Sequence, residues 1–329
     1  MKALLNRLYE HDYLSREEAC QVLLDIGHGQ YPDVQVAAFA TVFNMRAIGH
    51  EELLGFRDAL LQLSLNPGLE GEGSIDIVGT GGDGKHAFNI STTAALVVAG
   101  AGYRVIKHGS YGVSSAVGSS DVLMAMGYTF TNDPDTLRRQ LDSAGICFLH
   151  APLFHPALKA VVPVRRDLAT RTFFNILGPL VNPAQPSHQL LGTYSLELSR
   201  LYAHVMQEAG KRYAVVYSLD GYDEASLTGP FKLRTNSSEL LCYPEELGFE
   251  TLSPDALRGG SDAAASARIL RQILAEEGTL AQKSAVMVNA ALAIQCLCPE
   301  KTMEACIAEA GVSLESGAAQ RVWNKLTDQ

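Results

Sequence analysis

The stretch from Asp76 to Gly127 constrains the fold most strongly, because it contains a strand, a polar glycine-rich loop and a helix start twice in succession. The β-branched run at 75–78 suits a buried strand, and the loop Gly79–Gly84 holds too many glycines to continue it. Residues 89–93 then offer several N-cap side chains before an apolar helix expected at 94–101. Free N–H groups and the positive end of that helix would face an anion held by the loop.

The second copy places a strand at 104–106, which ends in Lys107, before a loop at 110–118 and a helix start at 119–121. Hydroxyl side chains accompany both helix starts, namely Ser91, Thr92, Ser114, Ser115 and Ser119. Two helix N-termini, a lysine and these hydroxyls can bind more phosphate than a single site needs. The sequence therefore predicts a ligand with two or more phosphate groups.

The glycine loop formally matches a dinucleotide-binding fingerprint, with glycines at 79, 81 and 84 after a strand. That fold needs a helix that starts within the glycine motif and an acidic residue about twenty positions on. Here residues 85–90 intervene, and the second strand ends in Lys107-His108. A nicotinamide cofactor is disfavoured, and the Walker pattern fails as well because no Lys-Ser or Lys-Thr follows Gly84.

The chain as a whole indicates an α/β protein with a small all-helical N-terminal domain. Residues 3–65 show helical periodicity, and Asn66-Pro67-Gly68 breaks it, so a helical domain at 1–68 is expected to precede an α/β domain at 69–329. Beyond Gly127, strand-like and helix-like segments alternate, which favours a mostly parallel central sheet. The predicted strands include 128–130, 146–149, 190–194 and 213–218, with two more after Asp223; the predicted helices are 133–144, 197–209, 262–277, 282–296 and 301–310.

Composition narrows the classes of partner and the compartment. The formal charge of −10 disfavours a nucleic-acid partner, since phosphate backbones require a basic surface. No signal-peptide core and no apolar run of about twenty residues is evident, so no membrane partner is expected. Six scattered cysteines without a Cys-x-x-Cys pair suit reduced thiols. We therefore expect a cytoplasmic protein.

A pair of adjacent acids, Asp223-Glu224, follows a strand and a turn at Gly221. An α/β protein presents ligand-binding groups beyond the carboxyl ends of its strands, so this pair is a candidate for Mg²⁺, although adjacent acids are more often solvated loop charge. Lys107 is likewise either a phosphate contact or a solvated strand end. Arg165 is either a ligand-binding group or the ion-pair partner of Asp167.

At these residues the chain resembles the anthranilate phosphoribosyltransferase family, which joins anthranilate to phosphoribosyl pyrophosphate (PRPP) in tryptophan biosynthesis. The matching motifs lie at 79–83, 89–92, 107–109, 118–121, 155–157, 171–183 and 223–227. They cover most of the chain, and the block 171–183 looks specific to this family. The resemblance implies a nucleoside phosphorylase/phosphoribosyltransferase fold, in which part of about 165–190 returns to the helical domain, and a homodimer.

The resemblance also implies roles for individual residues. For PRPP it implies Gly79, Gly82, Asp83, Asn89, Ile90, Ser91, Thr92, Lys107, Ser115 and Ser119; for anthranilate it implies Gly79, His108, Ser110, His155, Arg165 and Gly178; for Mg²⁺ it implies Ser91, Asp223 and Glu224. It implies no protein nucleophile, because the amine of the acceptor attacks the ribosyl carbon while pyrophosphate leaves.

Two positions depart from the family pattern. The family usually has asparagine where this chain has Ser110, and serine or threonine where it has Ala87. Ser110 keeps open a related phosphoribosyltransferase or nucleoside phosphorylase with a different acceptor, against which the block 171–183 argues. A non-catalytic binding protein with the same fold is a further alternative, against which Asp223-Glu224, Lys107 and the acidic charge argue.

Overall fold

The computed structural model describes residues 1–112 and 117–327, which form two compact units. One unit combines Met1–Asn66 with Ala151–Pro183, and the other combines Pro67–His150 with Ala184–Gln329. The segments that compose the first unit are therefore far apart in the sequence. The two units are described separately below.

The first unit is all-helical in its described secondary structure. Its elements are α1 (Lys2–Tyr9), α2 (Arg16–Gly27), α3 (Asp33–Met45), α4 (His50–Gln62), α8 (Ala151–Phe154), η1 (Pro156–Val161), α9 (Val162–Leu168), α10 (Phe174–Leu177) and η2 (Gly178–Leu180). Ser15 caps α2 by accepting a hydrogen bond from the backbone N–H of Glu18. Phe39 and Phe56 pack edge to face at 5.9 Å, and Phe173 from the later segment joins them. An aromatic core thus ties residues 151–183 to the N-terminal helices.

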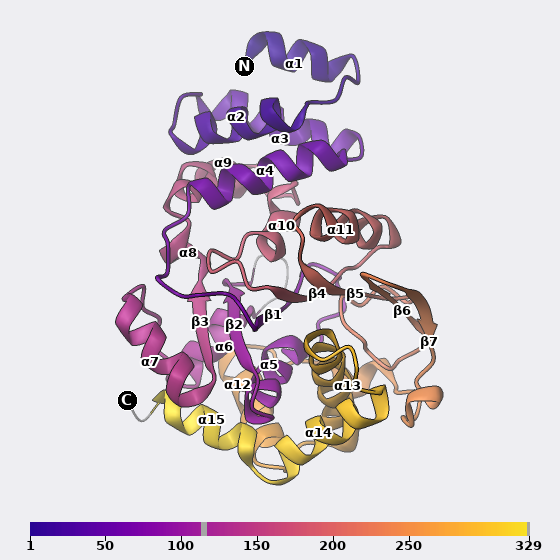
Figure 1. The fold of residues 1–329 in the computed structure, drawn as a ribbon. Coiled ribbons are helices and arrows are strands. Elements are labelled where there is room, and N and C mark those ends of the chain that lie inside the picture. Colours follow the sequence, from indigo (N-terminus) through magenta and orange to yellow (C-terminus); the bar gives the residue numbers. More distant parts are fainter. Residues whose placement is uncertain (113–116, 328–329) are drawn as a thin grey trace. The chain divides into compact units, whose positions relative to one another are not determined.

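The second unit contains a seven-stranded sheet in the order β3-β2-β1-β4-β5-β6-β7 (Figure 1). The strands are β1 (Ser74–Gly79), β2 (Arg104–Gly109), β3 (Ile146–His150), β4 (His188–Gly192), β5 (Arg212–Ser218), β6 (Phe231–Thr235) and β7 (Glu239–Cys242). The first five are parallel, and β6 and β7 add antiparallel strands at one edge. The predicted α/β class with a mostly parallel sheet is confirmed.

Helices cover both faces of this sheet, as buried parallel strands require. The helices are α5 (Ile90–Gly100), α6 (Ser119–Ala125), α7 (Pro134–Ala144), α11 (Leu196–Glu208), α12 (Ala263–Leu274), α13 (Leu280–Leu297), α14 (Met303–Glu315) and α15 (Ala318–Thr327), with short turns η3 (Glu245–Leu247) and η4 (Pro254–Leu257). In Figure 1, α5 and α13 lie on one face and α11 lies on the other. Among the described residues only α13 is long and apolar enough to span a membrane, and it packs against α5 and β4 in this core.

The predicted secondary structure differs from the observed one in three details. Residues 128–130 form no strand, because Tyr128 packs edge to face on Phe148 and Phe130 stacks on His150. The alternation of aromatic residues thus reflects packing onto β3 and not pairing beside it. The helix expected at 94–101 begins earlier, at Ile90, with Asn89 as its N-cap. A further helix, α15, lies beyond the last predicted one.

His155 is a buried histidine of the first unit. Its Nε2–H donates to the carbonyl oxygen of Val181 at 3.0 Å, and burial lowers the pKa of the ring to about 4. The ring is therefore neutral at pH 7 and holds the end of the returning segment. An unfolded chain would bind a proton at this ring near pH 6.5.

The difference between the folded and unfolded pKa of His155 predicts that the folded protein becomes less stable as the pH falls. The folded pKa is depressed, so the stability that it carries is present above about pH 6.5 and is lost as the pH falls toward 4. Between about pH 7 and 4.5 the wild-type protein should lose roughly 2 kcal/mol more unfolding free energy than His155→Gln. Urea unfolding followed by circular dichroism at both pH values checks this, with the exposed His28→Gln as a control. Equal pH dependence in wild type and His155→Gln would contradict it.

Candidate active site

The strand order reverses between β1 and β4, which is where open α/β sheets bind ligands. The chain moves from β1 toward β2 and β3 on one side and from β4 toward β5 on the other. β1 and β4 end level with each other, with Gly79 paired to Gly192. A Cβ at Gly192 would lie 1.5 Å from the backbone oxygen of Asp223, and one at Gly79 would lie 2.4 Å from its Oδ2. Both strands therefore end in glycine because the segment that carries Asp223 lies directly against them.

The glycine loop after β1 binds the side chain of Asp223. The backbone N–H of Gly81 donates to Oδ2 of Asp223 at 2.6 Å, and the Thr80 hydroxyl donates to the same oxygen at 3.3 Å. Gly81, Gly82 and Gly84 have φ between +66° and +74°, a conformation that favours glycine. This loop therefore turns back on itself and presents an N–H group to a carboxylate.

Glu224 lies at the N-terminus of α5. Its Oε1 accepts hydrogen bonds from the backbone N–H of Ser91 at 3.1 Å and from the Ser91 hydroxyl at 2.9 Å. The predicted attraction of this helix start for negative charge is therefore met, in this structure, by a carboxylate of the protein itself. Asp83, in the glycine loop, accepts from the N–H of Lys85 at 3.0 Å.

The two adjacent carboxyls are electrostatically costly. Burial, and then the negative charge of Asp83, raise the pKa of Asp223 to about 7. Burial, and then the charge of Asp223, raise the pKa of Glu224 to about 8. No group of three or more His, Cys, Asp or Glu side chains that could hold a metal occurs among residues 1–112 and 117–327. The site thus offers two close carboxylates and a hydroxyl, which suits a hard cation that also takes oxygens from a substrate.

Lys107 is not a solvated strand end, which was one of the two alternatives for it. The side chain is buried, and Nζ donates to the carbonyl oxygen of Ile77 on the neighbouring strand β1. Burial lowers its pKa, while the nearby carboxylates of Asp76 and Glu224 act in the opposite direction. The next residue, His108, is also buried, and its backbone N–H donates to Oδ1 of Asp76 at 3.2 Å. Lys107 therefore places a basic group within the sheet, close to Asp76 and Glu224.

The second predicted loop is closed by Asp121. Its Oδ2 accepts from the N–H groups of Gly112 and Gly118 at 2.9 and 2.8 Å. The carbonyl oxygen of Ser110 accepts from the N–H of Ser120 at 3.1 Å and from the hydroxyl of Ser119 at 3.4 Å. These bonds fix both ends of the loop, while Ser114 and Ser115 lie outside the described residues.

Three residues predicted for the acceptor belong to the first unit. His155 is buried as described above, and Gly178 is exposed at the start of η2. Arg165 on α9 is half-buried, and its guanidinium lies 6.0 Å from the ring centre of Phe174. Asp167 does not pair with Arg165, since it pairs with Arg166 at 3.2 Å. The structure places these three residues in one unit and Gly79, His108 and Ser110 in the other.

Sequence reasoning missed three residues that build the site. Gly192 lies within the strand predicted at 190–194 and ends the observed β4, and its role depends on the segment at Asp223, which follows only after α11 and β5. Asp76 is a buried carboxylate on β1. Asn289 is a polar residue within the apolar helix α13, and its side chain binds the backbone of Ala225. For Asn289, its polar side chain within an apolar helix is the sequence signal that could have identified it.

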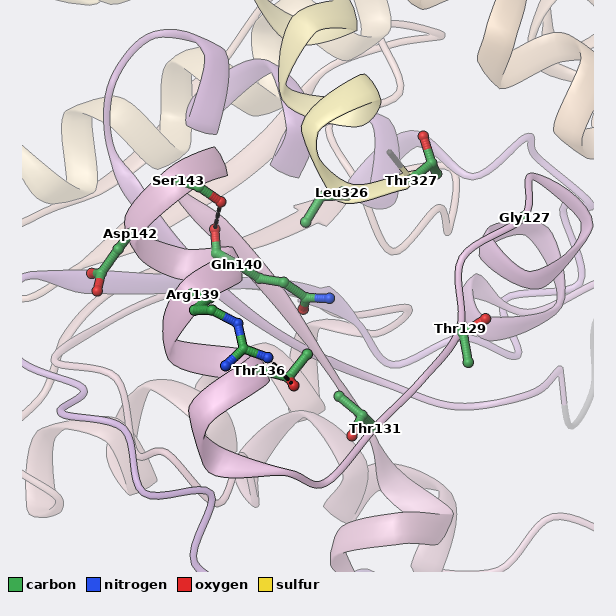
Figure 2. Close-up of a pocket in the computed structure, with 10 residues that line it drawn as sticks. All are labelled: Gly127, Thr129, Thr131, Thr136, Arg139, Gln140, Asp142, Ser143, Leu326 and Thr327. Atoms are coloured by element: carbon green, nitrogen blue, oxygen red, sulfur yellow. Dashed lines mark hydrogen bonds between the residues drawn. The ribbon is translucent and has the colours of Figure 1, made fainter. Parts of the chain in front are cut away.

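A concave surface lies apart from these residues. Figure 2 shows an open groove lined by α7, α15 and the segment 127–131, with Gln140 and Arg139 on one side. Gln140 accepts from the hydroxyl of Tyr128, and Arg139 donates to Thr136. None of the predicted site residues lines this groove.

Comparison with known proteins agrees with this architecture. Residues 71–320 match the model described as "Glycosyl transferase family, a/b domain", and residues 2–64 match "Glycosyl transferase family, helical bundle domain". An anthranilate phosphoribosyltransferase of Bacteroides fragilis (strain YCH46) is 53% identical over 328 residues, which cover 100% of this chain and 99% of the relative.

Solved structures give the same result. The crystal structure of anthranilate phosphoribosyltransferase from Thermus thermophilus superposes with a TM-score of 0.91 at 31% identity and covers 98% of each chain. The enzyme from Saccharomyces cerevisiae in complex with PRPP and Mg superposes with a TM-score of 0.89 at 26% identity, over 98% of this chain and 96% of that one. Sequence similarity over the full length, the matched domains and the shared fold together establish that this chain belongs to the anthranilate phosphoribosyltransferase family.

Proposed function

We propose that this protein transfers the 5-phosphoribosyl group of PRPP to the amine of anthranilate and releases pyrophosphate. The observation that carries the proposal is the pair Asp223 and Glu224, held against a glycine loop and a helix N-terminus where the strand order reverses. Such a site suits a cation bound together with phosphate groups. Family membership identifies PRPP as the phosphate donor and anthranilate as the acceptor.

For the donor, we propose that the glycine loop and the first turn of α5 bind the phosphate groups. The residues are Gly79, Gly82, Asp83, Asn89, Ile90, Ser91, Thr92, Lys107, Ser115 and Ser119. The left-handed glycines of the loop support this, because their N–H groups can approach a ligand without side chains in the way. While its Nζ donates to the carbonyl oxygen of Ile77, Lys107 would attract the phosphate groups through its charge and not through a direct hydrogen bond.

For the metal, we propose that Asp223, Glu224 and Ser91 hold Mg²⁺. Their oxygens fit a hard cation, and the raised pKa of each carboxyl indicates that a positive charge would be stabilising there. When bound, Mg²⁺ would stabilise the negative charge that develops on departing pyrophosphate. The relative solved with PRPP and Mg supports Mg²⁺ as the metal.

For the acceptor, we propose that Arg165 takes the carboxylate of anthranilate, with contributions from Gly79, His108, Ser110, His155 and Gly178. A guanidinium fork matches a carboxylate. No acidic side chain forms an ion pair with Arg165 in the described part of the chain, and burial lowers its pKa. An anionic ligand would therefore find this group uncommitted.

Catalysis on this proposal depends on position and charge. The aromatic amine of anthranilate is neutral at pH 7 and needs no base before it attacks the ribosyl carbon. The N–H groups of the glycine loop and of α5 would stabilise the leaving group as the sugar becomes oxocarbenium-like, and alignment of the two substrates lowers the barrier further. No side chain has to form a covalent intermediate.

We also propose a homodimer and a cytoplasmic location. Apolar side chains are exposed on helices of the first unit that contact one another, namely Tyr9 on α1, Val34 and Met45 on α3 and Val162 on α9. A second copy of the chain would cover them. The six free cysteines suit a reducing compartment.

The reaction itself is tested by anthranilate fluorescence. We expect the purified protein to consume anthranilate only when PRPP and Mg²⁺ are both present. Metal-dependent PRPP binding without consumption would move the search to another acceptor, and no PRPP binding at all would refute the proposed function.

The doubly neutral variant Asp223→Asn, Glu224→Gln is the matched control for that assay. It keeps the shape of both side chains and removes their charge, so kcat/KM for PRPP should fall about 100-fold or more. Its melting temperature should not fall, because burial and mutual repulsion disfavour both charges in the wild type. Wild-type activity in this variant would contradict the assigned metal site.

Substitution of Ser110 tests the acceptor assignment. Ser110→Asn restores the usual family residue and leaves the backbone bonds of Ser110 to Ser119 and Ser120 in place. One additional hydrogen bond should lower KM for anthranilate roughly 2- to 10-fold, while KM for PRPP changes less than about twofold. Steady-state kinetics with each substrate varied in turn measures both values, with the exposed Ser143→Asn as a control. Equal changes in both KM values would contradict the role of Ser110.

Charge substitution tests the dimer. Val34 and Met45 are 75% and 80% exposed, so Val34→Asp, Met45→Asp should leave the fold intact and convert the dimer to a monomer, because each protomer would bury two charges in the interface. Light scattering gives the mass directly. Leu280→Asp, at a residue that is 74% exposed in the second unit, should remain dimeric. A wild-type monomer would refute the dimer.

A further inference from the structure

We infer that Asn289 is a positioning residue that holds Asp223 and Glu224 in the geometry required for a divalent cation; this rests on the proposed function. Asn289 lies on α13, 64 residues beyond Ala225, and only 2% of it is exposed. Its Oδ1 accepts from the N–H of Ala225 at 3.1 Å, and its Nδ2 donates to the carbonyl oxygen of Ala225 at 2.9 Å. The amide thus binds both polar groups of the residue that directly follows the acidic pair.

The orientation of this amide is itself fixed. Nδ2 also donates to the carbonyl oxygen of Ala285, one turn earlier on α13, at 2.8 Å. α13 packs against α5, whose first turn binds Glu224 through Ser91. The backbone beside Glu224 and the helix that carries Ser91 are therefore both attached to α13.

The segment needs such support for two reasons. Two carboxyl groups lie side by side, with Asp223 buried and Glu224 half-buried, and repulsion between them when both are ionised would favour any movement that exposes one to water. In addition, buried Leu227 has φ +60°, a left-handed conformation that is strained for a residue with a side chain and persists only where surrounding contacts impose it.

The hydrogen bonds of Asn289 to Ala225 form one clamp on this segment, and those of Ser218 form a second clamp on its other side. Ser218, at the end of β5, donates through Oγ to the carbonyl oxygen of Glu224 at 2.6 Å and accepts from the N–H of Ser226 at 3.3 Å. Peptide groups on both sides of Ala225 are thus held by α13 and by the sheet. Loss of either clamp should loosen the carboxylates without removing a metal ligand.

Calorimetric titration with PRPP, in Mg²⁺ and again in EDTA, separates positioning from general stability. For Asn289→Ala we expect PRPP affinity in Mg²⁺ to fall about 10- to 100-fold, as for other residues that orient metal ligands, while affinity in EDTA changes less than about twofold. Ser218→Ala should act in the same direction and replaces Asn289→Ala if that variant does not fold.

Ser313→Ala is the control. It removes a buried hydrogen bond of 2.7 Å between α14 and the carbonyl oxygen of Val97 on α5, away from the acidic pair. This variant should keep the full gain in PRPP affinity from Mg²⁺. An unchanged gain in both clamp variants, or an equal loss in Ser313→Ala, would overturn the inference while leaving the proposed function intact. Absence of any Mg²⁺-dependent gain in the wild type would refute the proposed metal site and the inference with it.

Discussion

The close approach of the backbone at Asp223 to the ends of β1 and β4 is the constraint on which the site depends. Two strands that end level, at Gly79 and Gly192, leave room for a third segment only because neither carries a side chain. Asp223 then reaches the N–H of Gly81, and Glu224 reaches the start of α5. One packing contact therefore brings together a glycine loop, a helix N-terminus and two acids from distant parts of the chain.

The electrostatics of this arrangement are unfavourable for the folded chain alone. Burial raises the pKa of Asp223 to about 7 and that of Glu224 to about 8, so each charge is costly at neutral pH. Lys107 and the N-terminus of α5 offset part of that cost. Hydrogen bonds from Asn289 and Ser218 hold the backbone while the side chains repel each other. A cation bound at this site would relieve the unfavourable electrostatic free energy of the two carboxylates. Binding sites commonly contain such locally unfavourable charges, unlike the rest of a fold.

Comparison of prediction with structure shows which signals were local. The glycine loop, the strand before it and the N-cap candidates at 89–93 follow from residue types with strong backbone preferences, although α5 begins earlier than expected. Position beyond a strand also identified Asp223 and Glu224 as a pair of interest. The environment of Lys107 was not predictable, because its partner, the carbonyl oxygen of Ile77, is set by strand pairing. Tyr128 and Phe130 were misassigned because alternating aromatic residues also suit a segment packed on a neighbouring strand.

By itself, the sequence determined the α/β class, the two glycine-loop units, the acidic pair and, through its motifs, the family. Each of these depends on residues close together in the chain, whose conformations follow from local sterics and periodicity. Tertiary structure alone decided that Gly192 must lack a side chain, that Lys107 points into the sheet and that Asn289 binds Ala225. The physical reason is that sheet order and helix packing fix contacts between residues 30 to 143 positions apart in the sequence. The local conformational preference of a residue does not determine which distant residue it contacts.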